Sequence, residues 1–255
     1  MDPNLERQLL SASRSVEEVR RLAYRDPDRI GQLVEQISVL ADLRQKEGDF
    51  RKAESLYREA LYRAQELKKP DPDLLCGIHS LLAHLYDRWG RMDKAAEYYE
   101  KALKIADDAG LKDNDKVATI KNNLAMIFKG LRDYKKAEQY YQEALDIFRL
   151  ADGDESPRVA SVLNNLGVLC YTNVDVDRAQ PMHGRALGIR QSLANDQLDP
   201  ADLSQTYINL GAVYKATGDF QKADVCVDRA KRIRSGMNGF HANPRRAAAL
   251  LIDKT

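Results

Sequence analysis

The sequence has 255 residues, of which 44% are hydrophobic and 31% are charged, with few Gly or Pro. This composition is typical of a helical globular protein and excludes a disordered or fibrous chain. With 40 basic against 39 acidic residues, the net charge of +1 gives no overall attraction to nucleic acid or to an anionic membrane. The first residues are polar and no run of about 18 apolar residues occurs. We therefore expect a cytoplasmic protein that does not insert into a membrane.

The chain opens with residues 1–26, which we interpret as an N-terminal helical cap. A helix is predicted over residues 4–24, with a break at 13–15, where Ser15 and Glu18 form a capping-box pattern. Asp26-Pro27 then begins the first long helix, because Asp accepts hydrogen bonds from free amides and Pro is tolerated at the first helical position. The same start signal returns four times, as Asp71-Pro72-Asp73, Asp113-Asn114-Asp115, Ser156-Pro157 and Asp199-Pro200.

A repeat follows, and it is visible as columns of small residues. In the first helix of each unit the column is Ala41, Ala83, Ala125, Gly167 and Gly211, at spacings of 42, 42, 42 and 44 residues. In the second helix the columns are Ala53, Ala95, Ala137, Ala179 and Ala223, then Tyr57, Tyr99, Tyr141, His183 and Val227, then Ala60, Ala102, Ala144, Ala186 and Ala230. Such self-similarity indicates units that cannot bury their apolar faces alone and must stack on their neighbours.

Each unit contains a first helix, a tight turn and a second helix. The turns contain residues that tolerate a left-handed backbone or cap the next helix, at Gly48-Asp49, Gly90-Arg91, 130–133, 173–175 and Gly218-Asp219. The sequence predicts five repeats, at about 27–70, 71–112, 113–155, 156–198 and 199–235. Residues 236–255 are predicted to form a C-terminal loop and a short capping helix that begins at Asn243-Pro244.

Three cysteines are present, Cys76, Cys170 and Cys226, and they are far apart in the sequence. Their number is odd and none belongs to a CxxC pair, so neither a disulfide framework nor a zinc site is indicated. Cys170 and Cys226 stand where other units carry aromatic residues. We expect all three to be small buried thiols in a reducing compartment.

The columns resemble the tetratricopeptide repeat, with Leu-Ala or Leu-Gly in the first helix and Ala, Tyr and Ala-Leu in the second. The longer period of 42 residues, with Asn-Asn-Leu-Ala at 122–125, Asn-Asn-Leu-Gly at 164–167 and AQPMHGRALGIR at 179–190, is similar to the kinesin-light-chain type of repeat. The resemblance covers about residues 27–235. The sequence departs from it at Val39, where Asn is expected, and at Cys226 and Val227, which replace an aromatic pair.

The resemblance implies an all-α fold, an α-solenoid of antiparallel helix hairpins with five repeats plus terminal helices. It also implies a non-catalytic adaptor whose first helices line a concave groove that binds a peptide or a partner protein. On a helical wheel Leu124 and Phe128 fall on one side, and Asn122, Asn123 and Met126 fall on the other. If the first set packs, the second set faces the groove.

In the family, one column forms a ladder of amides that hydrogen-bond the backbone of a ligand. The resemblance places Asn123, Asn165 and Asn209 in that column, with Asn122 and Asn164 beside them. An Asn side chain offers two donors and two acceptors, so it can pair with the N–H and C=O of an extended peptide without requiring a particular sequence. The alternative is that these amides cap or link neighbouring helices, and both interpretations stay open.

Cations lie further along the same face and bear on the charge of the ligand. The face carries Arg88, Lys129 and Lys215, with Lys46 and Tyr171 at comparable places and His84 one turn earlier. Cations at intervals favour an acidic peptide or a C-terminal carboxylate. However, Glu35, Asp42 and Asp87 also approach this face, and lysines on an exposed helix are usually only a solvated surface. The acidic ligand is therefore one of two interpretations.

Catalysis finds no support in the motifs. No GxSxG, HExxH or glycine-rich phosphate loop is present, and His79, His183 and His241 have no second ligand at metal spacing. We expect no enzyme activity, no cofactor and no metal. A regulatory phosphatase or effector would have to use the N-terminal helices, where only Glu6, Gln8, Glu17 and Glu18 are available without an activating partner.

The sequence allows two further kinds of partner. Self-association would place the terminal helix reading AAALLI, or the 4–24 segment, in the groove of a neighbouring copy. Nucleic acid could meet the basic residues near the end of the chain, Lys231, Arg232, Arg234, Arg245, Arg246 and Lys254. No aromatic stacking platform accompanies these cations, which disfavours RNA binding.

Overall fold

The computed structural model describes residues 3–111, 115–193 and 198–240. In these residues the fold consists of eleven α-helices without a β-strand, which confirms the predicted all-α class. The chain divides into two compact units, unit 1 (Met1–Leu131) and unit 2 (Arg132–Thr255). Within the described residues, none of the helices is long and apolar enough to cross a membrane.

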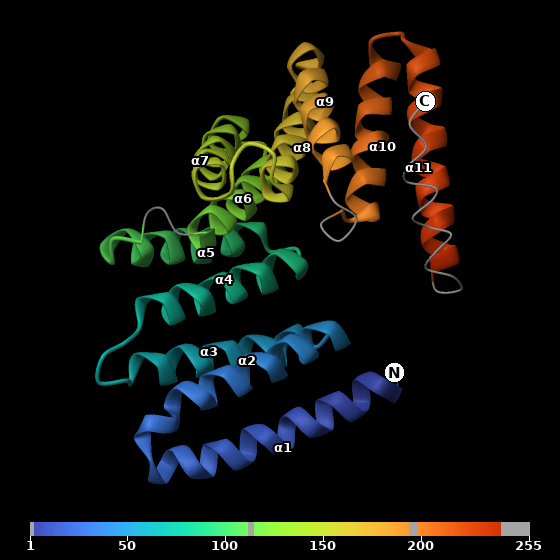
Figure 1. The fold of residues 1–255 in the computed structure, drawn as a ribbon. Helices are drawn as coiled ribbons and strands as arrows, with labels where there is room; N and C mark the ends of the chain where they lie inside the picture. The colour runs from blue at the N-terminus through green and yellow to red at the C-terminus, as the bar shows by residue number, and fades with distance from the viewer. Residues whose placement is uncertain (1–2, 112–114, 194–197, 241–255) are drawn as a thin grey trace. The chain divides into compact units, whose positions relative to one another are not determined.

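The helices follow one another in the order that the repeat predicts (Figure 1). Those of unit 1 are α1 (Pro3–Arg25), α2 (Ile30–Glu47), α3 (Phe50–Gln65), α4 (Pro72–Arg88), α5 (Met92–Asp108) and α6 (Asp115–Gly130). Those of unit 2 are α7 (Tyr134–Asp152), α8 (Pro157–Thr172), α9 (Val176–Ser192), α10 (Pro200–Ala216) and α11 (Phe220–Phe240).

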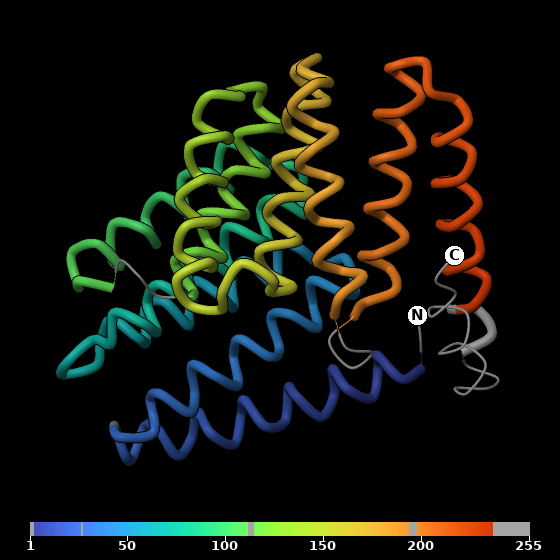
Figure 2. Tube along the Cα trace, turned by 45° about the horizontal axis from the view of Figure 1, so that its top comes forward, coloured from blue at the N-terminus to red at the C-terminus, as the bar shows by residue number. Residues whose placement is uncertain are grey.

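Helix hairpins form the core of each unit. In unit 1, α2 packs on α3 and α4 packs on α5, while α1 covers α2 and α6 packs on α5. In unit 2, α8 packs on α9 and α10 packs on α11, while α7 contacts α8 and α9 contacts α10. The tube in Figure 2 shows the hairpins of each unit running side by side. The boundaries between the repeats stay predictions.

The small-residue columns are buried as the repeat predicts. Ala41, Ala83 and Ala125 have no exposed surface, and neither do Ala53, Ala95, Ala137 and Ala179 in the second helices. Tyr57, Tyr99 and Tyr141 are also buried, at 2% exposure or less. A small side chain lets two helices approach closely and leaves room for an aromatic ring, so the two kinds of column are needed together.

Side-chain caps begin most of the first helices. The Asp71 carboxylate accepts from the Asp73 amide at 3.0 Å, and Ser156 and Asp199 cap α8 and α10 in the same way, which confirms three of the predicted start signals. Helix α2 differs, because residues 27–29 form a 3₁₀ turn and the helix begins only at Ile30. Asp113 and Asn114 lie outside the described residues, and α6 begins at Asp115.

Both predicted interruptions near the ends are absent from the described residues. Helix α1 is continuous through Ser15, and the Ser15 hydroxyl donates to Gln36 Oε1 on α2 at 2.8 Å instead of capping a new helix. Helix α11 continues to Phe240, through the first part of the loop predicted after Ser235. The predicted capping helix that begins at Asn243-Pro244 lies outside the described residues.

The turns within the repeats share one backbone feature. The residue before the N-cap of each second helix has a positive φ, and it is Gly48, Gly90, Arg132, Val174 or Gly218. Glycine adopts this left-handed conformation without a steric penalty, whereas a β-branched residue does not. Val174 has φ +62° and is 84% exposed, so it stores strain that no packing contact offsets.

The substitution Val174→Gly is therefore expected to raise the free energy of unfolding by about 1 kcal/mol. The left-handed conformation costs a non-glycine residue about 1–3 kcal/mol, and the added freedom of glycine in the unfolded chain takes back part of the gain. Urea denaturation followed by circular dichroism measures the change. Gly218→Val is the reciprocal control and should lose stability; a destabilised Val174→Gly would contradict the strain at this turn.

Candidate functional site

A cleft lies between the first helices of unit 1. It has a volume of about 590 Å³ and is lined by residues of α2, α4, the cap of α4, the second helix α3 and the first turn of α6. Val34 and Ile78 are buried at its floor, while Val39 is 48% exposed and Leu81 is 37% exposed. The size lies in the range of ordinary ligand pockets, and apolar side chains that remain accessible suit the anchoring of a partner.

The border of this cleft is acidic. Its acidic lining residues are Glu35, Asp42, Asp71 and Asp73. Among the described lining residues Lys116 is the basic one, and its ammonium group pairs with Asp73. Lys46, which the sequence suggested as a cation for an acidic ligand, pairs with Asp42 at 2.7 Å. This part of the surface therefore carries the opposite charge to the one an acidic peptide would need.

Helix α6 presents the predicted amides of unit 1. Asn122 and Asn123 are half-buried, and Asn122 Nδ2 donates to Asn123 Oδ1 at 3.3 Å. The Asn123 side chain also hydrogen-bonds with Tyr99, whose pKa rises to about 12 because burial disfavours the phenolate. Met126 is 44% exposed. The wheel prediction is confirmed for packing, since Leu124 and the rest of the opposite side are buried.

The predicted cations of unit 1 differ in their surroundings. Lys129 on α6 is half-buried, and burial lowers the pKa of its ammonium group. Arg88 is exposed at the last turn of α4. His84 is exposed as well, and its Nδ1 lies 3.2 Å from Nε2 of the buried Gln45 on α2. His84 thus links the two helices that form the cleft.

In unit 2 four of the predicted contact residues keep accessible surface and one is almost completely buried. Asn165 and Asn209 are half-buried, and Tyr171 and Lys215 are exposed. Asn164 is only 7% exposed, and its Oδ1 accepts from Asn209 Nδ2 at 3.1 Å, which joins α8 to α10. For Asn164 the structure therefore shows the alternative that the sequence left open, an amide that links neighbouring helices.

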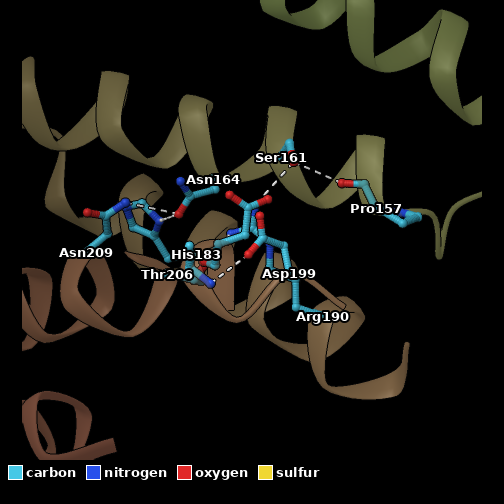
Figure 3. Close-up of polar contacts among 10 residues, drawn as sticks. Pro157, Ser161, Asn164, His183, Arg190, Asp199, Thr206 and Asn209 are labelled. Carbon is cyan, nitrogen blue, oxygen red and sulfur yellow. Dashed lines mark hydrogen bonds and ion pairs between the residues drawn. The ribbon is translucent and has the colours of Figure 1, made fainter. Parts of the chain in front are cut away.

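Asn164 belongs to a buried polar cluster that sequence reasoning missed (Figure 3). Its Oδ1 also lies 3.0 Å from Nδ1 of His183, a residue that the sequence identified only as a replacement for a packing tyrosine. His183 is buried, and burial together with the nearby Arg190 charge lowers its pKa to about 4. The imidazole therefore stays neutral in the folded protein at neutral pH.

His183 lies directly on the backbone of α8. A Cβ added at Gly167 would come within 2.7 Å of the imidazole ring, closer than two carbon or nitrogen atoms can approach. The signal in the sequence was the joint change of two columns, because this unit has Gly in place of Ala and His in place of Tyr. The glycine makes the space that the ring occupies.

Arg190 is the second buried polar residue that was missed. It is 4% exposed and joins three helices, because its guanidinium donates to Ser161 Oγ on α8 at 3.2 Å (Figure 3). The guanidinium also donates to Asp202 Oδ2 on α10 at 3.1 Å. It also hydrogen-bonds with Thr206. Burial lowers the pKa of Arg190, and the carboxylates of Asp202 and Asp199 oppose that shift. In the first three units this position is Ala64, Ala106 or Phe148, and in the fifth it is Arg234, so the change from an apolar to a charged residue was the available signal.

The other residues that the sequence suggested for chemistry are buried or paired with a neighbouring side chain. Cys76, Cys170 and Cys226 are buried free thiols, as expected, and burial raises the pKa of each. Glu17, one of the acidic residues considered for an effector activity, forms an ion pair with Arg20 on α1. Within the described ranges, His, Cys, Asp and Glu side chains form no cluster of three that could hold a metal ion.

The comparison with protein families identifies the repeat. A model of the tetratricopeptide repeat matches residues 35–108 and 116–192, and a second model of the same repeat matches residues 204–236. No curated protein matches the chain.

Solved structures share the fold. The crystal structure of BtubC (BKLC) from P. vanneervenii is 76% identical, with a TM-score of 0.87, and the alignment covers 100% of both chains. A putative kinesin light chain from Podosopora anserina with nearly identical TPR-like repeats is 17% identical, with a TM-score of 0.66 over 80% of this chain and 96% of that one. A Rap protein complexed with Competence and Sporulation Factor is 18% identical, with a TM-score of 0.65 over 89% of this chain and 66% of that one.

The last two likenesses concern the fold alone. The repeat models, in contrast, match more than half of this chain, and the first structure is 76% identical over the full length. The protein belongs to the tetratricopeptide-repeat family.

Proposed function

We propose that the protein is a non-catalytic scaffold that binds a peptide or a partner protein on the face that its first helices expose. The tetratricopeptide fold suggests protein–protein interaction in general. The proposal of a peptide-binding face rests on the different exposure of the two sides of α6. Leu124 is buried, whereas Asn122, Asn123 and Met126 keep accessible surface. Amides beside an accessible thioether suit the backbone and the side chains of a peptide.

Unit 2 supports the same proposal with fewer residues. Asn165 and Asn209 keep accessible surface on α8 and α10, and Tyr171 and Lys215 are exposed further along those helices. Asn164 is left out of the proposed contact set, because it is only 7% exposed and its amide hydrogen-bonds with His183 and Asn209. A Rap protein of the same fold has been crystallised with Competence and Sporulation Factor, which shows that the fold accommodates a ligand in that protein.

The double substitution Asn123→Ala with Asn165→Ala is expected to weaken partner binding about tenfold or more. Each lost hydrogen bond contributes about 0.5–1.5 kcal/mol to the free energy of binding. The two free energies add, so their effects on the dissociation constant multiply. Wild-type and variant chains serve as baits in native cell extract, and quantitative mass spectrometry measures the proteins retained by each.

Asn173→Ala is the matched control, because Asn173 is an exposed asparagine in the turn after α8. It should retain the wild-type set of proteins. Circular dichroism melting must show that the double variant remains folded. A folded double variant that retains every wild-type partner would remove the asparagine face from the proposed site.

A further inference from the structure

The cleft between α2 and α4 has no occupant among the described residues, and its chemistry restricts what it can bind. Accessible Val39 and Leu81 provide an apolar surface above the buried Val34 and Ile78. Glu35 on α2 and Asp71 at the start of α4 add negative charge along the border, whereas Asp42 and Asp73 are paired with Lys46 and Lys116. A complementary segment therefore carries branched aliphatic side chains next to basic ones.

The sequence contains such a segment at 241–255. Arg245 and Arg246 directly precede the run Ala-Ala-Ala-Leu-Leu-Ile, and the sequence predicts a short helix after Pro244. At helical spacing Leu250 and Leu251 share a face with alanines one turn earlier. The segment thus carries both the basic and the aliphatic side chains that the border and the floor of the cleft would complement.

The surface of α11, which directly precedes this segment, does not offer the same complementarity. Helix α11 carries five basic residues and two acidic residues. Like charges placed together disfavour a contact, so Arg245 and Arg246 would be repelled by α11 and attracted by the cleft.

We propose that residues 241–255 of one copy dock in the α2–α4 cleft of a second copy of this chain, with the leucines on Val39 and Leu81 and the arginines at the acidic border. The proposal deepens the proposed function, since it uses the exposed face of the first helices for homotypic assembly. A contact of this kind joins two different surfaces, so it can close reciprocally into a dimer or continue into a chain.

The test measures association of the full chain by sedimentation velocity over a wide range of concentrations. The segment variant is Arg245→Glu with Arg246→Glu, and the cleft variant is Glu35→Arg with Asp42→Arg, which leaves the Asp71 cap intact. Each variant alone is expected to associate about tenfold more weakly than wild type, because like charges then face each other. Added salt should weaken the wild-type association.

Two mixtures make the test specific. An equimolar mixture of the two variants should associate, because one supplies an intact cleft and the other an intact segment. A chain that carries all four substitutions should also regain association, because the charges are exchanged. The control Asp93→Arg with Glu100→Arg reverses two exposed carboxylates of α5 outside the cleft and should behave as wild type.

The proposal is overturned if wild type sediments as a monomer at every concentration, or if either variant associates as wild type does. It is also overturned if the mixture of variants does not associate. The cleft variant changes α2 and the asparagine variant changes α6 and α8, so failure of this inference and failure of partner capture can be distinguished.

Discussion

Replacing Gly167 with alanine is expected to lower the free energy of unfolding by about 3 kcal/mol, the upper part of the usual range for overpacking. The new methyl group would lie 2.7 Å from ring atoms of His183, and the buried ring has little space in which to move. The hydrogen bond that holds the imidazole near Asn164 would be disturbed as well. Urea denaturation followed by circular dichroism measures the loss.

Gly184→Ala provides the matched control in unit 2. Gly184 is a helical glycine of α9 with no atom within 4 Å of an added Cβ. Alanine there should be neutral or stabilising by about 0.5–1 kcal/mol, because glycine is the poorer helix former. Combining Gly167→Ala with His183→Tyr restores the pairing of small and aromatic residues found in the first three units, and should recover part of the loss. A Gly167→Ala variant with the stability of wild type would show that the His183 ring does not lie against α8.

The second large effect is a dependence of stability on pH that originates at His183. In the unfolded chain an imidazole has a pKa near 6.5, and in the folded protein the pKa is lowered to about 4. Between these values the unfolded state binds more protons, so stability is lost as the pH falls from 6.5 towards 4. The lowered pKa corresponds to about 3 kcal/mol in total, of which about 2 kcal/mol is lost between pH 7 and pH 5.

The variant His183→Gln removes this titration and keeps a neutral side chain that can hydrogen-bond. Denaturation at pH 7 and at pH 5 should show that wild type loses about 2 kcal/mol more than the variant. Part of the dependence of stability on pH will remain in the variant, because burial also lowers the pKa of His79 in unit 1. Equal losses in the two proteins would mean that His183 is already protonated in the folded state at pH 5.

The side of the helix on which a candidate residue lies could be predicted from the sequence, because the position of a residue within a repeat indicates that side. Leu124 and Ala125 are buried and Met126 is exposed, as the wheel predicts. Asn122 and Asn164 show the limit of that reasoning. They occupy equivalent positions, yet Asn122 is half-buried and Asn164 is almost completely covered. Asn164 hydrogen-bonds with His183 and Asn209, which lie on two other helices.

The charge of the α2–α4 cleft was visible in the sequence only in part, through Glu35 and Asp42, since Asp71 and Asp73 also lie at its border. Arg88, Lys129 and Lys215 suggested an acidic ligand, whereas the cleft in unit 1 is bordered by carboxylates. Those carboxylates come from two helices and from a helix cap that are separated in the chain. A pattern within one repeat cannot reveal which charges of different repeats collect around one cavity, since that depends on how the hairpins stack.

The sequence by itself determined the class of fold, the helices and most of their starts. These features depend on local causes, namely the spacing of small and aromatic residues, the capping side chains and the turn residues. Only the tertiary structure decided that His183 rests on Gly167, that Arg190 joins three helices and that an acidic cleft lies between α2 and α4. These features depend on side chains that meet across helices, and periodicity along one helix carries no information about what the next helix places opposite it.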